Sequence, residues 1–288
     1  MSRATGATEL PVLLPMRDSA QPGEWGLATP LSLLRSPRLL GVLVALAVLS
    51  AAAAVAASPE ARPSVLSLLL KWAPLIFSGF LFNLLVSIAS MAIGTAAGLL
   101  LGLAQVSLHA PVRGFAWSVT QFFRNAPWLV LLFFAMFLLP FELSVGGWIV
   151  PFPAWLKAII GLSLPVLANV SEIVRGGVSS IPIGQWESAE SLAFTRRQTI
   201  WRIVLPQAIK RMLPPWMNLY AILTMATTLI SVVGIQDSMT LTRGALVAEG
   251  RTDLYLPIYF MLLALFFAYC YPIARYTQIL ERRFAVKA

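Results

Sequence analysis

Uninterrupted apolar runs constrain the fold of this chain more than any other feature. Six runs contain no Asp, Glu, Lys or Arg, and they cover residues 39–58, 76–107, 125–140, 158–171, 212–236 and 254–274. About 20 apolar residues in a helix cross the roughly 30 Å of hydrocarbon in a bilayer, and lipid offers no partner to unpaired backbone groups. The runs therefore predict an all-α integral membrane protein with about six transmembrane helices.

Two of the runs are shorter than a full span. Residues 125–140 and 158–171 lie close to Trp148 and Trp155 in the sequence, and tryptophan is enriched where a helix leaves the hydrocarbon for the headgroups. We expect both helices to extend until these tryptophans anchor them at the membrane surface.

The basic residues follow the rule that cytoplasmic loops of membrane proteins are rich in Lys and Arg. If the N-terminus is cytoplasmic and six helices alternate, 16 of the 21 basic residues fall inside. The five outside are Arg62, Lys71, Lys157, Arg243 and Arg251. The net charge of +9 can also suit nucleic acid, but the charges here lie between apolar runs, so we expect a lipid bilayer and no nucleic-acid partner. The prediction is a multi-pass membrane protein with both termini in the cytoplasm.

The chain lacks the residues that energy-converting chemistry needs. A P-loop holds phosphate with glycines and a lysine that follows a glycine, and none of the four lysines has this position. His109 and Cys270 are the only histidine and the only cysteine, so no metal site is expected. Ion-coupled carriers usually place ionisable groups near the middle of the bilayer, and the six runs have none. We therefore expect neither enzyme activity nor a cofactor in this chain.

One segment is charged although it lies between apolar runs. It reads GQWESAESLAFTRRQTIWRIVLPQAIKRMLPP and covers residues 184–215. We expect Gly176 and Gly177 to end the preceding helix, and Pro182 bars its continuation. The count of basic residues places this segment in the cytoplasm.

A capping box marks the start of a helix inside this segment. Thr195 and Gln198 have its spacing, in which each side chain bonds the backbone amide of the other residue. The pattern predicts a turn near Ala193 and a short helix that begins at Arg196.

The predicted short helix has two different faces. One face is expected to hold the apolar residues Ile200, Trp201, Ile203, Val204 and Leu205, and the other the basic residues Arg196, Arg197 and Arg202. The basic face suits the anionic headgroups of lipids, and it suits an acidic or polar surface of a protein partner equally well. Physical chemistry alone leaves both interpretations open.

The spacing of residues in this segment resembles the EAA loop of type I ABC importer permeases. That loop reads EAA, three residues, G, nine residues, and I-x-L-P. This chain has Glu187, Ser188 and Ala189, then three residues, Ala193, then nine residues, and IVLP at 203–206. The spacing matches at every step, and two of the letters differ.

The flanking sequence is similar to the amino-acid (polar amino acid) branch of that family. SEIVRGGVSSIPIGQ precedes the motif and PQAIKRMLPP follows it. FFRNAPWLV at residues 122–130 resembles the R-x-x-P loop of the same branch. The likeness runs from about Phe80 to Arg275.

The resemblance implies that the segment forms coupling helices that dock on a separate ATP-binding subunit. Glu187 is then the acidic contact to that ATPase, and Ala189 packs close by. The full set of expected coupling residues is Gly184, Gln185, Glu187, Ser188, Ala189, Ala193, Arg196, Arg197, Arg202, Ile203, Leu205 and Pro206. Two ATPase copies would bind ATP and Mg, a second permease subunit would complete a homo- or heterodimer, and a periplasmic solute-binding protein would deliver the solute.

Several positions depart from the family pattern. Ala193 stands where the family has glycine, and a left-handed backbone there would cost alanine on the order of 1 kcal/mol. Ser188 replaces a second alanine of similar size. MATTL at 225–229 replaces K-D-T-S-L, and Asn169 replaces a frequent tyrosine. The identity of the solute therefore stays open.

Polar side chains in or beside the predicted spans are candidates for the solute pathway. They are Asn83, Asn169, Glu172, Asn218, Thr224, Thr227 and Thr228. The alternative for each is a hydrogen bond between helices, and for Glu172 it is an ion pair with Arg175, three residues on. The chain as a whole is expected to be the permease subunit of an ATP-driven amino-acid importer. The alternatives are an ion-gradient-driven carrier or channel without an ATPase, and a membrane scaffold or sensor.

The resemblance implies a bacterial inner membrane, and together with the composition and the apolar runs it gives the expected domain boundaries. A type I permease domain is expected at 76–277, with a cytoplasmic tail at 278–288. Ahead of it we expect a mobile cytoplasmic leader at 1–35, an extra transmembrane helix at 36–58 and a periplasmic connector at 59–75. The small residues that end the first apolar run also resemble a signal-peptidase site, so its retention or cleavage stays open.

Overall fold

The structure is a computed structural model that describes residues 63–145 and 148–284 of the 288-residue chain. The expected leader at 1–35 and the extra helix at 36–58 lie outside these residues. Within the described part, four helices are long and apolar enough to cross a membrane, and a bent helix pair makes five if it counts as one span. The all-α membrane class predicted from the apolar runs is confirmed.

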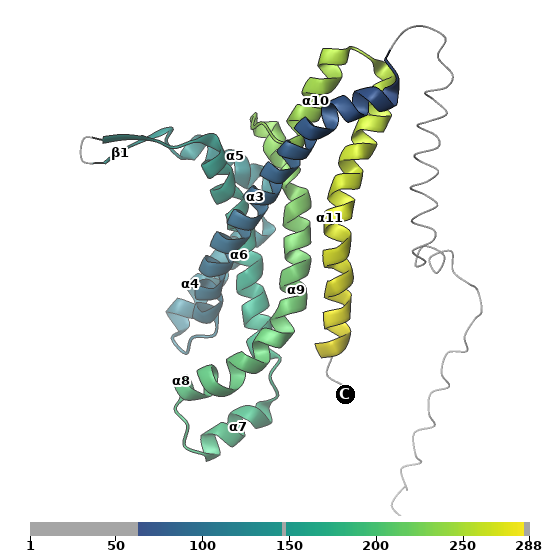
Figure 1. Cartoon of the computed structure of the whole chain (residues 1–288). Helices are drawn as coiled ribbons and strands as arrows, with labels where there is room; N and C mark the ends of the chain where they lie inside the picture. Colours follow the sequence, from purple (N-terminus) through teal and green to yellow (C-terminus); the bar gives the residue numbers. More distant parts are fainter. Residues whose placement is uncertain (1–62, 146–147, 285–288) are drawn as a thin grey trace, which may run out of the picture. The chain divides into compact units, whose positions relative to one another are not determined.

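The described chain consists of helices joined by turns, with one β-hairpin (Figure 1). The longest helices are α3 (Val65–Gln105), α6 (Ala154–Ser179), α9 (Leu205–Ala226) and α11 (Tyr255–Phe284). The shorter elements are α4 (Ala110–Asn125), α5 (Trp128–Leu138), β1 (Glu142–Val145), β2 (Trp148–Pro151), α7 (Ile183–Ser191), α8 (Arg196–Thr199), the π-helical turn η1 (Ile200–Val204), the 3₁₀ segments η2 (Thr227–Val233) and η3 (Thr252–Leu254), and α10 (Ser238–Glu249). Helices α7 and α8 and the C-terminal end of α11 lie at one end of this bundle, and α10 lies at the opposite end (Figure 1).

Two long helices reach beyond their predicted limits. Helix α3 begins at Val65, where the side chain of Ser64 accepts a hydrogen bond from Ser67 N at 3.2 Å. The expected connector at 59–75 is therefore helical from Val65 onward. Helix α11 continues to Phe284, well into the expected tail.

The third predicted span differs most from its expected form. Helices α4 and α5 meet at 104°, because the backbone is extended at Ala126 and Pro127 and proline has no N–H to continue the first helix. Helix α5 has only 11 residues, and the antiparallel strands β1 and β2 follow it. Trp148 lies in a strand, so the expectation that it extends this helix is wrong. Trp155 does lie in α6, as expected.

A buried lysine closes the end of the short helix α5. Lys157 counts among the expected outside residues, yet its side chain is 0% exposed. Its Nζ donates to Leu139 O at 2.8 Å and to Met136 O at 3.3 Å, and such carbonyls at a helix end lack partners in their own helix. The ring of Phe141 lies 3.4 Å from the same Nζ, a favourable cation–π distance. Lys157 therefore fastens α5 to α6 instead of facing water.

Glycines let helices α3 and α6 approach closely. The α3 positions are Gly94, Gly98 and Gly102, and the α6 positions opposite them are Val166, Val170 and Val174. A Cβ atom at Gly98 would lie 2.7 Å from Leu167 O and from Val170 Cβ, so only glycine fits. Small residues four positions apart are typical of closely packed helices in membranes. This contact forms the centre of the bundle.

The helices α8 and α9 belong to one helical stretch that runs from Arg196 to Val233. The short helix that begins at Arg196 and the membrane span expected from Met212 are therefore parts of one continuous helical stretch. Pro206 has no N–H for a regular helix, and the π-helical turn η1 directly before it absorbs the change in hydrogen bonding.

Polar contacts at the α10 end of the bundle join the start of α3 to the turn after α10. Glu249 Oε1 accepts hydrogen bonds from Lys71 Nζ at 2.6 Å and from Trp72 Nε1 at 2.8 Å. These two donors, helped by the charge of Arg251, hold the pKa of Glu249 below its ordinary value. Arg251 Nη1 also donates to Pro63 O at 2.6 Å. The ends of α3 and α10 are therefore held together.

Candidate coupling loop and solute pocket

The loop between α6 and α9 turns sharply at Ala193. Phe194 N donates to Ala189 O at 3.0 Å, and Ala193 N donates to Glu190 O at 2.8 Å. These two bonds form a Schellman motif, whose turning residue is usually a left-handed glycine. Ala193 has a φ of 55°. The predicted turn is confirmed, and alanine occupies a conformation that favours glycine.

Replacing Ala193 by glycine is expected to stabilise this turn. A left-handed backbone costs an alanine about 1–2 kcal/mol, and part of the gain is offset because glycine is freer in the unfolded chain. The expected net gain is about 0.5–1 kcal/mol. Hydrogen exchange at the Phe194 amide should therefore slow by about two- to fivefold in Ala193→Gly. Unchanged exchange at Phe194, with the amides of α11 as the internal reference, would contradict this strain.

The capping box after the turn is present as predicted. Gln198 N donates to Thr195 Oγ1 at 3.3 Å, and Thr195 N donates to Gln198 Oε1 at 2.9 Å. Helix α8 begins at Arg196. The guanidinium of Arg196 lies 5.7 Å from the ring centre of Trp186, and its Nη2 is 3.5 Å from Val106 O. The turn is therefore fixed to α7 and to the end of α3.

Two local expectations for this region are wrong. Helix α6 continues through Gly176 and Gly177, since glycine weakens a helix without forbidding it and Gly177 packs against Met212. Trp201 was expected on the packed apolar face but is 57% exposed, whereas Val204 is fully buried. The π-helical turn η1 has a wider spacing than the α-helical pattern assumes, and this difference rotates Trp201 outward.

The expected coupling residues lie together on one projecting loop. Glu187 and the basic residues Arg196, Arg197 and Arg202 are exposed, whereas Ala189 is 0% exposed. Among the others, the exposed residues are Gly184, Gln185, Ser188, Ala193 and Pro206, and the half-buried ones are Ile203 and Leu205. The loop therefore presents charge outward around a small buried residue.

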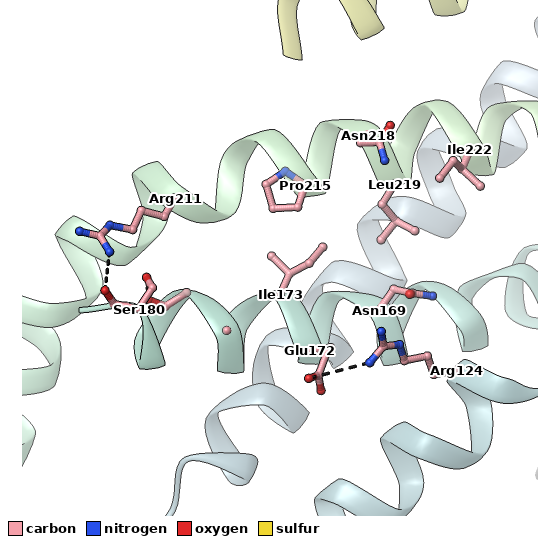
Figure 2. A pocket seen from close by; sticks show the side chains of 12 residues that line it. Arg124, Asn169, Glu172, Ile173, Ser180, Arg211, Pro215, Asn218, Leu219 and Ile222 are labelled. Carbon is pink, nitrogen blue, oxygen red and sulfur yellow. Dashed lines mark hydrogen bonds and ion pairs between the residues drawn. The ribbon is translucent and has the colours of Figure 1, made fainter. Parts of the chain in front are cut away.

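A pocket of about 460 Å³ lies between α6 and α9. Its lining consists of Arg124, Asn169, Glu172, Ile173, Gly176, Gly177, Ser180, Arg211, Pro215, Asn218, Leu219 and Ile222. Figure 2 shows Arg211 beside Ser180 at one end and Arg124 beside Glu172 toward the other, with Ile173 between them. The pocket combines polar ends with an apolar middle.

The electrostatics of the pocket centre on one carboxylate. Arg175 Nε donates to Glu172 Oε1 at 3.0 Å, so the expected ion pair is confirmed. Arg124 Nη1 lies 3.9 Å from the same oxygen. The second oxygen, Glu172 Oε2, is buried without a hydrogen-bond partner in the described part of the chain. The lining thus contains two arginines, at 124 and 211, and one carboxylate that is already paired with Arg175.

The structure separates the predicted pathway residues into two groups. Asn169, Glu172 and Asn218 line the pocket. Three others are 0% exposed and away from its lining: Asn83, Thr224 and Thr227. Thr228 is half-buried and donates to Met225 O at 2.9 Å. The residues of this second group make hydrogen bonds within the bundle.

Three charged residues are important here but were not predicted as pathway residues. Arg124 and Arg211 line the pocket, and both stand in the segments that carry the family resemblance, so the signal was present. Asp237 is 0% exposed. It follows directly after the charge-free run 212–236 and therefore escaped a search for charges within the runs.

A bundle of membrane-spanning helices that carries a capped, charged two-helix loop at one end defines a membrane transport subunit. Residues 94–286 match the family described as the binding-protein-dependent transport system inner membrane component. The chain belongs to this family and is a permease subunit of an ABC importer.

Relatives within the family cover most of the described chain. YckA of Bacillus subtilis, named as a probable amino-acid ABC transporter permease protein, is 35% identical over 212 residues, which are 74% of this chain and 90% of YckA. TcyB of Bacillus subtilis, an L-cystine transport system permease protein, is 29% identical over 73% of this chain and 86% of its own. Both relatives of this chain are named as permease proteins of transport systems.

Solved structures share the fold. One is described as the crystal structure of an amino acid ABC transporter with histidines, and its chain has a TM-score of 0.67 at 27% identity, over 77% of this chain and 99% of that one. The inward-facing MetNI methionine ABC transporter has a TM-score of 0.54 at 17% identity, over 78% and 99% of the two chains. The second likeness concerns the fold alone.

Proposed function

We propose that this permease subunit moves amino acids across a bacterial inner membrane with energy from ATP that a separate subunit hydrolyses. The observation that carries the proposal is the projecting loop α7–α8, which is capped, charged and continuous with α9. Two ABC ATPase copies would bind ATP and Mg, and this chain would hold neither a cofactor nor a catalytic site. A second permease subunit, identical or related, and a periplasmic solute-binding protein would complete the importer.

Force from the ATPase would reach the solute along α9. Helix α8 passes through η1 into α9 without interruption, and Arg211 and Asn218 of α9 line the pocket. When ATP draws the ATPase pair together, the loops would move with it, and α9 would shift one wall of the pocket.

The pocket has groups that suit an amino acid. The solute carboxylate would pair with Arg124 or Arg211, and the negative charge of Glu172 in the lining would favour its ammonium group. Asn169 and Asn218 would bond a polar side chain. Because the lining has two arginines and its one carboxylate already binds Arg175, a neutral polar or acidic amino acid fits better than a basic one.

The same proposal gives the protein its orientation. An ATPase is cytoplasmic, so the end with α7, α8 and the C-terminal end of α11 would face the cytoplasm, and α10 would face the periplasm. This orientation agrees with the distribution of Lys and Arg in the sequence, and it would put both termini in the cytoplasm.

The test combines purification and transport. The tagged full chain is purified from its native membranes, the accompanying proteins are identified, and the complex is reconstituted into vesicles. We expect an ABC ATPase to co-purify and labelled glutamine to enter only with ATP. Unlabelled glutamine or glutamate should compete at least about tenfold better than arginine, because a misplaced charge in such a site costs more than about 1.4 kcal/mol. Uptake that follows an ion gradient without ATP would instead identify a secondary carrier.

A further inference from the structure

The helical stretch formed by α8 and α9 ends in a 3₁₀ segment that leads into α10. Helix α9 changes into the 3₁₀ segment η2 at Thr227, and Gly234 follows with a left-handed φ of 81°. The side chain of Asp237 then caps α10, accepting from Thr240 N at 2.9 Å. A 3₁₀ turn and a left-handed glycine commonly end a helix, and here they form the connection from α9 to α10, residues 227–237, which we call the hinge.

A single side chain of α3 holds both ends of this stretch. Asn83 Nδ2 donates to Thr227 Oγ1 at 3.1 Å and to Asp237 Oδ2 at 3.2 Å. Ser238 N donates to Asn83 Oδ1 at 3.0 Å. All four residues are 0% exposed, so water does not replace any of these bonds. Asn83 therefore ties the hinge both to α3 and to the start of α10.

The two sides of the hinge differ in how firmly they are held. At the α10 side, a Cβ on Gly79 of α3 would lie 2.7 Å from Ser238 N, so the backbones of α3 and α10 are in direct contact. At the α9 side, Asn83 reaches η2 through its hydrogen bond to Thr227. Movement of η2 away from α3 would break this bond.

One buried polar group at the hinge has no partner. Ser238 Oγ lacks a hydrogen bond in the described residues, although Ser238 is 0% exposed. Buried hydroxyl groups without partners are uncommon because they lose their hydration. The N–H of the same residue already bonds Asn83, so this hydroxyl can accept a hydrogen bond from Asn83 in a second arrangement.

We propose that Asn83, Thr227, Asp237 and Ser238 form a latch that holds α9 in one of two positions during transport, with Asn83 as the positioning residue. In the described position, Asn83 Nδ2 binds Thr227. When α9 pivots, this N–H passes to Ser238 Oγ, while the bonds to Asp237 and Ser238 N keep α10 on α3. The inference rests on the proposed function, because ATP-driven movement of the coupling loop supplies the pivot.

The test removes the α9 side of the latch alone. Thr227→Val keeps the shape of the side chain and loses the oxygen that accepts from Asn83. The matched control is Thr242→Val, because Thr242 is also 0% exposed but its hydroxyl bonds only Ser238 O, within α10. Both variants are assembled into the full complex in vesicles, and we measure ATP hydrolysis without solute and the number of glutamine molecules imported per ATP.

We expect Thr227→Val to raise the rate of ATP hydrolysis without solute by about two- to tenfold, because one hydrogen bond changes an equilibrium by about that factor. The same variant should import fewer glutamine molecules per ATP. Thr242→Val should keep both values near those of the unchanged protein. Equal values for the two variants, in a complex that transports, would overturn the latch only. A full chain that never assembles with an ATPase would overturn the proposed function and the latch together.

A charge exchange provides a second test that does not depend on Thr227. Asn83→Asp alone brings two carboxylates together in a buried site, and we expect it to lose coupling or to fold poorly. Adding Asp237→Asn restores one amide and one carboxylate, and asparagine also caps helices well. The double variant should fold and assemble, but it should still import less glutamine per ATP, because a carboxylate at position 83 has no N–H to give to Thr227 or to Ser238 Oγ. Full recovery of import in the double variant would contradict the latch.

Discussion

Replacing Gly98 by leucine is expected to leave no folded protein in the membrane fraction. A Cβ atom there would lie 2.7 Å from Val170 Cβ and from Leu167 O, and the latter is backbone that moves only if α6 moves. Overpacking by a few methylene groups already costs about 1–3 kcal/mol, and here a whole side chain has no room. Since total stability is typically only about 5–15 kcal/mol, α3 and α6 would not stay packed. The measurement is the yield of monodisperse protein after extraction into detergent.

The control is Gly114→Leu, the same chemical change in helix α4. A Cβ at Gly114 has no neighbour within 4 Å, so this variant should be extracted with the yield and the melting temperature of the unchanged protein. If Gly98→Leu gave as much monodisperse protein as Gly114→Leu, the close packing of α3 on α6 would be wrong.

The glycine repeat behind this prediction is visible in the sequence, but its packing partner is not. Gly94, Gly98 and Gly102 recur every fourth residue and indicate a close helix contact. Which helix lies opposite depends on how the whole bundle assembles, and six predicted helices offered several choices. The structure shows that the valines of α6 fill the space above these glycines.

Several features that depend on neighbouring residues were predicted correctly, although the helix end at Gly176 and Gly177 was not. The capping box of Thr195 and Gln198, the start of α8 and the turn at Ala193 involve contacts no more than five residues apart. The ion pair of Glu172 with Arg175 spans three residues. Such contacts form whenever the local backbone is helical, so the sequence pattern was sufficient.

Features that depend on distant residues could not be predicted. Lys157 finds its carbonyl partners 18 and 21 residues away, and Asn83 meets Asp237 across 154 residues. Pro127 marks a break between α4 and α5, but the angle of 104° between the two helices was not predicted from it. The lining of the pocket also depends on how distant helices pack. Three of the seven predicted pathway residues line it, and so do two arginines that were not among the candidates.

Reversing the charge of Glu187 is expected to stop ATP-driven uptake while the protein still folds. Glu187 is exposed on α7, so Glu187→Lys disturbs no packing within the chain. If Glu187 meets a basic group of the ATPase, the variant places two like charges in a desolvated contact, which costs about 2–5 kcal/mol. Uptake of glutamine by the reconstituted complex should fall by at least about tenfold, and less ATPase should co-purify with the permease.

Glu190 provides the matched control, because it is also exposed on α7 and Glu190→Lys makes the same change in net charge. This pair of variants separates the two interpretations of the basic loop that the sequence left open. If the loop lay on anionic headgroups, either lysine would strengthen its attraction to the membrane, and the two variants would behave alike. If the loop docks on an ATPase through Glu187, only Glu187→Lys loses uptake, while Glu190→Lys transports glutamine at close to the original rate.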